Sequence, residues 1–72
     1  MKLRNLKPGD RFVARFYAPD AEEGDEPILT ITGAFVDVND GNKNYCVVRL
    51  DGVDKDVYEP SDLYVEKIEG GE

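Results

Sequence analysis

The sequence predicts an all-β fold, a single five-stranded and strongly bent barrel. Apolar and polar residues alternate in several short runs, and no segment shows helical periodicity over about ten residues. Turn-forming residues recur roughly every ten positions, as in small barrels built from short strands. The 72 residues suffice for one domain with a small core. We expect the core within residues 11–69 and a frayed tail over 70–72.

The first predicted strand is RFVARFY, residues 11–17, in which apolar positions alternate with amphipathic ones. It follows the turn signal Lys7-Pro8-Gly9-Asp10. The next segment, residues 18–27, contains five carboxylates and no apolar residue larger than alanine besides its two prolines. Because such a segment cannot contribute to the core, we expect an exposed acidic loop.

The segment ILTITGAFVDVN, residues 28–39, is long for one strand. Its apolar residues before Gly33 share one face, and those after Gly33 share a face of the opposite parity. A glycine at this change of parity predicts a bulge or a sharp bend. The following Asp40-Gly41-Asn42 predicts a hairpin tip.

The C-terminal third predicts the remaining strands. Tyr45–Leu50 alternates, and Asp51-Gly52 is a two-residue hairpin signal that leads into a partner strand over Val53–Tyr58. A single 3₁₀ turn is expected near Pro60–Leu63, followed by a closing strand over Tyr64–Ile68.

Charge and composition restrict the classes of function. The net charge is −7, although five of the first fifteen residues are basic and only one is acidic. We therefore expect one small basic patch on an acidic body, which does not favour direct binding to nucleic acid or membranes. The single cysteine, Cys46, lies between apolar neighbours, so we expect a buried, reduced thiol. No run has transmembrane length, and a soluble, cytoplasmic protein is expected.

The chain carries no pattern typical of catalysis or of a cofactor. It has no histidine for acid–base work near neutral pH and no glycine-rich phosphate loop. The segment Asp37–Asn42 is superficially similar to a calcium loop, but its glycine comes one position early and Val48 stands where a bidentate glutamate is required. We therefore expect no enzyme activity, no cofactor and no metal site.

The order of the elements resembles that of SH3-like barrels. Residues 59–66, EPSDLYVE, are similar to the Pro-Ser-Asn-Tyr-Val-Glu segment that ends SH3 domains, with one extra residue. Residues 33–38, GAFVDV, resemble the family's Gly-Asp-x-Ile-x-Val turn and strand. Residues 14–17, ARFY, followed by the acidic loop, are similar in position to its Ala-Leu-Tyr-Asp-Tyr start. Tyr45-Cys46 replaces the tandem tryptophan of SH3 domains, so the resemblance does not imply a proline-rich ligand.

The resemblance implies that several tyrosines lie along one side of the barrel beside the acidic loop. This predicted partner-binding side comprises Tyr17, Asp25, Glu26, Tyr45, Pro60 and Tyr64. A tyrosine-lined groove next to carboxylates suits an extended peptide that carries Arg or Lys. The sequence therefore predicts a protein-binding module or small accessory protein. The competing interpretation is that the rings cover the barrel ends and satisfy their hydroxyls locally.

Two further functions are consistent with the sequence. An acidic inhibitor of the phage or mobile-element type would block a nucleic-acid-binding protein by presenting carboxylates in place of phosphates. A KOW-like domain, which the Lys-Pro-Gly-Asp start resembles, would use its N-terminal basic residues to bind nucleic acid or the ribosome. Those residues are Lys2, Arg4, Lys7 and Arg11. An exposed edge strand leaves a monomer or a weak homodimer as the expected state.

Overall fold

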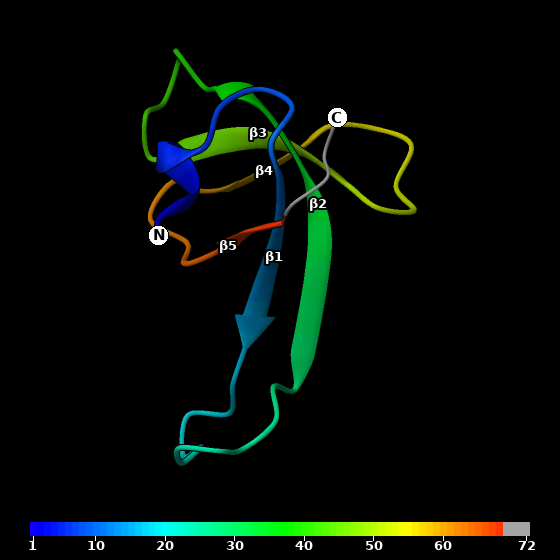
Figure 1. Ribbon diagram of the computed structural model, residues 1–72. Coiled ribbons are helices and arrows are strands. Elements are labelled where there is room, and N and C mark those ends of the chain that lie inside the picture. The colour runs from blue at the N-terminus through cyan, green and yellow to red at the C-terminus, as the bar shows by residue number, and fades with distance from the viewer. Residues whose placement is uncertain (69–72) are drawn as a thin grey trace.

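The computed structural model describes residues 1–68, which form five strands and one short 3₁₀ helix (Figure 1). The elements are η1 (Leu3–Asn5), β1 (Arg11–Phe16), β2 (Leu29–Val38), β3 (Tyr45–Leu50), β4 (Val57–Pro60) and β5 (Glu66–Ile68). All strands belong to one antiparallel sheet in the order β4-β3-β2-β1-β5. The prediction of an all-β fold with five strands is confirmed. The expected tail over 70–72 lies outside the described residues.

The prediction of a closed and strongly bent barrel is wrong, because the sheet is neither closed nor strongly curled. Its two outer strands, β4 and β5, have only four and three residues and do not pair with each other. The N-terminal segment instead bonds to the connection between them. The amide of Leu3 donates to the Leu63 carbonyl at 2.8 Å, and the amide of Val65 donates to the Met1 carbonyl at 2.8 Å. The N-terminal segment thus occupies the place of a closing strand pair.

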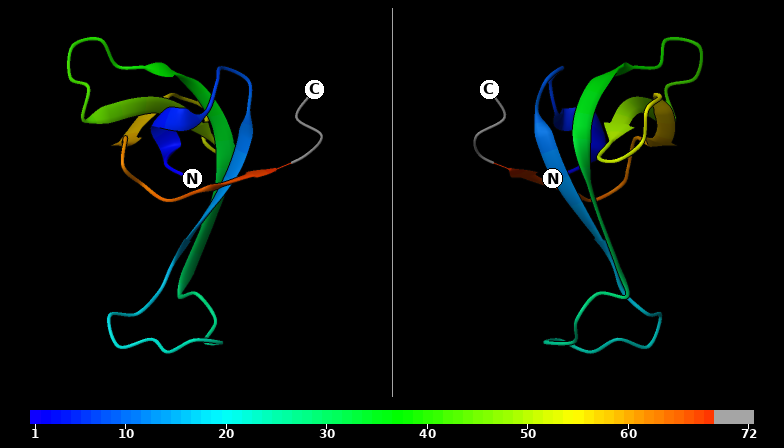
Figure 2. Two further views of the ribbon diagram at one scale, coloured as in Figure 1. Left: turned by 60° about the vertical axis from the view of Figure 1, so that its left-hand side comes forward. Right: turned by 90° about the vertical axis from the view of Figure 1, so that its right-hand side faces the viewer.

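Strand β2 is shared between two groups of strands. It pairs with β1 over residues 29–34 and with β3 over residues 33–38. Figure 2 shows the result: β1 and the first half of β2 extend from the body as a two-stranded arm with the acidic loop at its tip. We call this hairpin the arm. The length of this strand and an irregularity within it were expected from the sequence, although the irregularity lies at another position.

The sequence predicted an irregularity in β2 at Gly33, but the structure has it at Val36. The register with β1 is regular through Gly33, and the shift in the β3 register falls between Phe35 and Asp37. Gly33 has another role. A Cβ atom on it would lie 2.6 Å from the carbonyl oxygen of Arg49. Close backbone approach is therefore what requires glycine at the point where β2 changes partners.

The Asp51-Gly52 signal marks a turn but not a two-residue hairpin, because β4 begins at Val57 instead of Val53. The turn itself forms, with the Val53 amide donating to Leu50 at 3.1 Å. Asp51 is held by β2, however: its amide donates to the Thr32 carbonyl at 3.0 Å, and its carboxylate accepts from the Thr32 hydroxyl at 2.6 Å. These bonds draw the start of the turn toward β2 and leave a wider loop before β4.

The C-terminal elements also differ from the prediction. Pro60–Leu63 forms a single turn, with the Leu63 amide donating to the Pro60 carbonyl at 3.1 Å, whereas the 3₁₀ helix is η1. The closing strand is shorter than Tyr64–Ile68, since Tyr64 makes only an isolated bridge to Lys2 and β5 begins at Glu66.

The core lies on one face of the sheet and includes two residues before the predicted start at residue 11. The fully or almost fully buried apolar residues are Leu3, Leu6, Phe12, Ala14, Phe35, Cys46, Val48 and Val65. Cys46 is 1% exposed and unpaired, as predicted. Its Sγ lies 3.3 Å from the hydroxyl of Ser61, which donates to the Lys43 carbonyl at 2.8 Å. Residues 1–68 contain no helix with the length and apolarity to cross a membrane.

Candidate partner-binding groove

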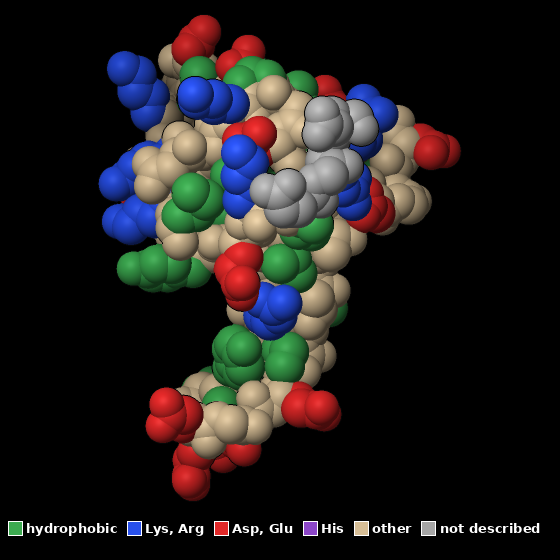
Figure 3. Space-filling view, in the orientation of Figure 1, with side chains coloured by type: hydrophobic (Ala, Val, Ile, Leu, Met, Phe, Trp, Pro, Cys, Tyr) green, Lys and Arg blue, Asp and Glu red, His purple; other side chains and the backbone are tan. Residues whose placement is uncertain are grey.

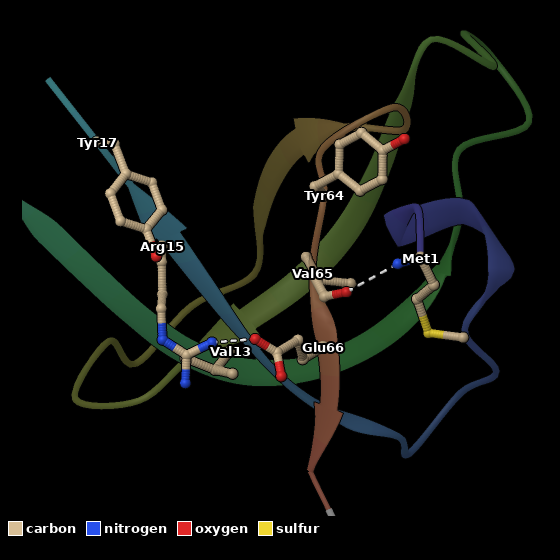
Figure 4. A pocket seen from close by; sticks show the side chains of 7 residues that line it. All are labelled: Met1, Val13, Arg15, Tyr17, Tyr64, Val65 and Glu66. Atoms are coloured by element: carbon tan, nitrogen blue, oxygen red, sulfur yellow. Dashed lines mark hydrogen bonds and ion pairs between the residues drawn. The ribbon is translucent and has the colours of Figure 1, made fainter. Parts of the chain in front are cut away.

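A groove of about 240 Å³ opens between β1 and the segment 64–66. Its lining residues are Met1, Val13, Arg15, Tyr17, Tyr64, Val65 and Glu66. Val13, Arg15 and Tyr17 alternate along the chain, so their side chains lie on the same face of β1 and its extension. Figure 4 shows that the two walls diverge from Glu66 toward the tyrosines. We call this hollow the edge groove.

The edge groove brings together two of the predicted binding residues. Tyr17 is 50% exposed and Tyr64 is 72% exposed, and they stand on opposite walls (Figure 4). An ion pair between Arg15 and Glu66 joins the walls. The N-terminal ammonium of Met1 donates to the Val65 carbonyl at 3.2 Å and so holds the segment that carries Tyr64.

The acidic loop adjoins the edge groove through Tyr17. This ring also lines a second hollow of about 400 Å³, whose other walls belong to the loop residues 18–25. The loop is built from two successive turns, with amides of Ala21 and Asp25 donating to the carbonyls of Ala18 and Glu22 at 2.9 and 3.0 Å. Figure 3 shows acidic side chains gathered at the tip of the arm.

The two predicted acidic residues have different environments. Asp25 lines the loop hollow, and its Oδ2 accepts a hydrogen bond from the Glu22 amide at 2.9 Å. Glu26 is exposed and lines neither this hollow nor the edge groove. Asp25 therefore shares a hollow with Tyr17, whereas Glu26 adds charge to the loop and lines neither hollow.

Tyr45 and Pro60 lie elsewhere. They face each other across the β3–β4 pair, and Tyr45 lines a separate groove of about 400 Å³ together with Arg4, Lys43 and Ser61. The predicted single side is thus divided into two. The N-terminal segment runs from one groove to the other, with Met1 lining the edge groove and Arg4 lining the second one. Sequence alternation does not reveal this segment's position.

Most of the basic N-terminal residues are paired with carboxylates. Arg4 and Lys2 both contact Asp62, and Arg11 contacts Asp51 at 2.5 Å. By contrast, within residues 1–68 no ion pair joins a Lys or Arg to the acidic loop. The described part of the chain therefore presents its unneutralised charge mainly as carboxylate.

The contact between Arg11 and Asp51 shifts the ionisation of both groups. Hydrogen bonds from Arg11 and then from Thr32 lower the pKa of Asp51 below its ordinary value. The same hydrogen bond, with the attraction of the carboxylate, raises the pKa of Arg11. Both groups are ionised at neutral pH, and together they fasten the turn after β3 to β1 and β2.

The sequence did not single out Met1, Arg15 or Glu66 as groove residues. Arg15 carried a usable signal, because it stands two positions before Tyr17 on the same strand. Met1 and Glu66 carried none, since their position follows from tertiary hydrogen bonds and strand order. Among residues 1–68, no group of three or more His, Cys, Asp or Glu is arranged to hold a metal ion. Comparisons with protein-family models, curated proteins and solved structures gave no significant match to the chain.

Proposed function

We propose that this chain is a non-enzymatic protein-binding module that recognises its partner through the edge groove and the acidic loop. The observation that carries the proposal is the placement of Tyr17 and Tyr64. They come from distant parts of the sequence, line one groove and leave at least half of each residue's surface exposed to solvent. Exposed tyrosines supply large, rigid contact areas and are enriched in protein interfaces.

Exposure also weighs against a purely structural role for these rings. A tyrosine that covers the end of a core loses most of its exposed surface, whereas Tyr64 keeps 72%. Neither Tyr17 nor Tyr64 belongs to the cluster of core residues or to those packed against it. Their truncation should therefore affect binding much more than folding.

Affinity capture with matched variants tests this proposal. We expect a specific partner to be retained by the tagged wild-type chain and by Tyr58→Ala, and to be lost with Tyr64→Ala or Tyr17→Ala. Tyr58 is a suitable control because it is 65% exposed on β4 and does not line the edge groove. Retention of the partner by both groove variants would contradict the proposal.

A second candidate function is an acidic inhibitor that occupies a nucleic-acid site on another protein. The acidic loop favours it, since its five carboxylates have no ion pair within residues 1–68 and project at the arm tip. Binding of this kind should weaken steeply with salt and should be displaced by DNA or RNA. Salt-insensitive binding would exclude it. A KOW-like role has less support, because Lys2, Arg4 and Arg11 are already paired with carboxylates.

We also propose a distant relation to SH3-like domains, in which the N-terminal segment replaces closure of the barrel. The support is the order of elements along the chain: a long acidic loop after β1, a long β2, a turn after β3 and a short turn before β5. The relation concerns the fold only and does not specify a ligand.

A further inference from the structure

We propose that the partner segment binds as an additional β-strand on the outer edge of β1 at Ala14–Phe16, with a Lys or Arg at the end that reaches the acidic loop. This inference rests on the proposed function, because it specifies the chemistry of the partner that enters the edge groove. Its first support is the strand pairing. Strand β5 pairs with β1 only from Arg11 to Val13, although β1 continues to Phe16.

The chain before β5 turns away from β1 instead of extending the pairing. Val65 exchanges its two backbone hydrogen bonds with Met1, at 2.8 and 3.2 Å. Within residues 1–68, Ala14–Phe16 therefore has β2 as its only strand partner. The vacant position beside this segment is the edge groove (Figure 4).

The hydrogen-bond pattern shows which backbone groups face the vacant position. The Asp10 carbonyl accepts from the Phe35 amide, and the Phe16 carbonyl accepts from the Ile28 amide, each at 2.8 Å. The backbone N–H and C=O groups of the even-numbered residues along β1 therefore point toward β2. In an antiparallel strand the backbone N–H and C=O groups of the alternate residues point to the opposite side of the strand. Arg11 and Val13 accordingly face β5, and the N–H and C=O of Arg15 face the groove.

The opposite edge of the sheet is a poorer template for an added strand. The Ser61 amide donates to the Asn44 carbonyl at 2.8 Å, so the backbone N–H and C=O groups of the odd-numbered residues of β4 point toward β3. The backbone groups of Tyr58 and Pro60 therefore point outward, and Pro60 has no N–H to donate. Proline on an edge strand hinders pairing with another chain. The unblocked edge is that of β1, beside Tyr17 and Tyr64.

Charge complementarity identifies the occupant. An extended partner segment that pairs with the backbone of Arg15 would pass Tyr17 and Tyr64. One end of this segment would reach the loop of five carboxylates at residues 18–27. The groove's own cation, Arg15, is neutralised by Glu66. A basic, extended peptide fits both parts, because its backbone pairs with the strand edge while its charge meets the loop.

The test uses a random dodecapeptide library displayed on phage, selected against the whole chain. We expect enriched peptides to carry Lys or Arg at one end. A synthetic peptide of the most enriched sequence is then titrated by fluorescence anisotropy against three variants. Arg15→Pro removes the outward N–H and should weaken binding about tenfold or more. Tyr58→Pro places the same change on the β4 edge and should bind nearly as wild type, whereas Tyr64→Ala removes a ring that lines the groove and should lose binding.

The outcomes separate this inference from the proposed function. Binding that is lost with Tyr64→Ala but unchanged with a folded Arg15→Pro would overturn strand addition and leave the groove function intact. Absence of enriched peptides, or binding unaffected by either variant, would overturn both. If Arg15→Pro does not fold, hydrogen exchange in the wild-type complex decides: the Arg15 amide should exchange at least about tenfold more slowly with peptide bound, and an unchanged rate would refute the inference.

Discussion

Gly33 shows how a single residue determines the path of the sheet. Its Cα lies where β2 passes from β1 to β3, and an added Cβ would stand 2.6 Å from the Arg49 carbonyl oxygen. We predict that Gly33→Ala destabilises the fold by about 1–3 kcal/mol, because backbone must move to admit the methyl group. Urea unfolding at neutral pH measures this. Gly41→Ala is the control, since its Cβ would meet only a side-chain oxygen at 3.5 Å.

Asp51 should make the stability of the fold depend on acid. Hydrogen bonds from Arg11 and Thr32 lower its pKa in the folded chain, so it contributes stability that is present above its ordinary value near 3.8. That contribution is lost as the pH falls through the lowered pKa. Asp51→Asn should therefore be less stable than wild type at pH 7, and the difference should shrink below pH 3.8.

Thermal unfolding of both proteins over a pH series checks this prediction. A difference between Asp51→Asn and wild type that stays constant down to the acid transition would contradict the assignment. Glu59→Gln provides a control carboxylate outside the contact between Arg11 and Asp51.

Individual residues were predictable from the sequence where their neighbours in the chain decide their environment. Cys46 stands between apolar residues of one strand, and it is buried as predicted. Asp51 was not recognisable, because its partners Arg11 and Thr32 belong to other strands. Tyr17 and Tyr64 line one groove with Met1, whereas Tyr45 lines a separate groove with Arg4. The sequence pattern does not reveal that the N-terminal segment runs between these two grooves.

Among the elements, η1 is short but contributes to the core. Leu3 is completely buried, and its amide bonds to Leu63. We predict that Leu3→Ala lowers the free energy of unfolding by about 2–5 kcal/mol, as for other buried leucines. Leu29→Ala should change it by less than about 0.5 kcal/mol, because Leu29 is exposed on the arm. Equal effects in chemical denaturation would show that η1 is not part of the core.

The strands themselves were predictable from alternation, and their pairing was only partly so. β1, β2 and β3 lie close to the predicted ranges, because their apolar residues repeat with a period of two. The start of β4 was missed, since Asp51 is bound to β2, and no local signal reports that contact. The position of η1 against the β4–β5 connection is likewise a product of long-range hydrogen bonds.

For the whole molecule, the arm separates the requirements of folding from those of binding. The acidic loop contributes no residue to the core. We predict that changing its five carboxylates to the corresponding amides leaves the unfolding free energy within about 0.5 kcal/mol and weakens binding of a basic peptide by about tenfold or more. Parallel unfolding and anisotropy experiments measure both. Unchanged affinity would show that the loop is not part of the interface.

The unequal edges of the sheet also govern self-association. Two copies can pair through the open part of β1, and the β4 edge of each copy then remains at the outside of the joined sheet. Pro60 removes a donor from those edges. Growth of a continuous intermolecular sheet needs two compatible edges on every molecule. Pairing through β1 should therefore not continue through β4, because Pro60 limits growth of the sheet at that edge.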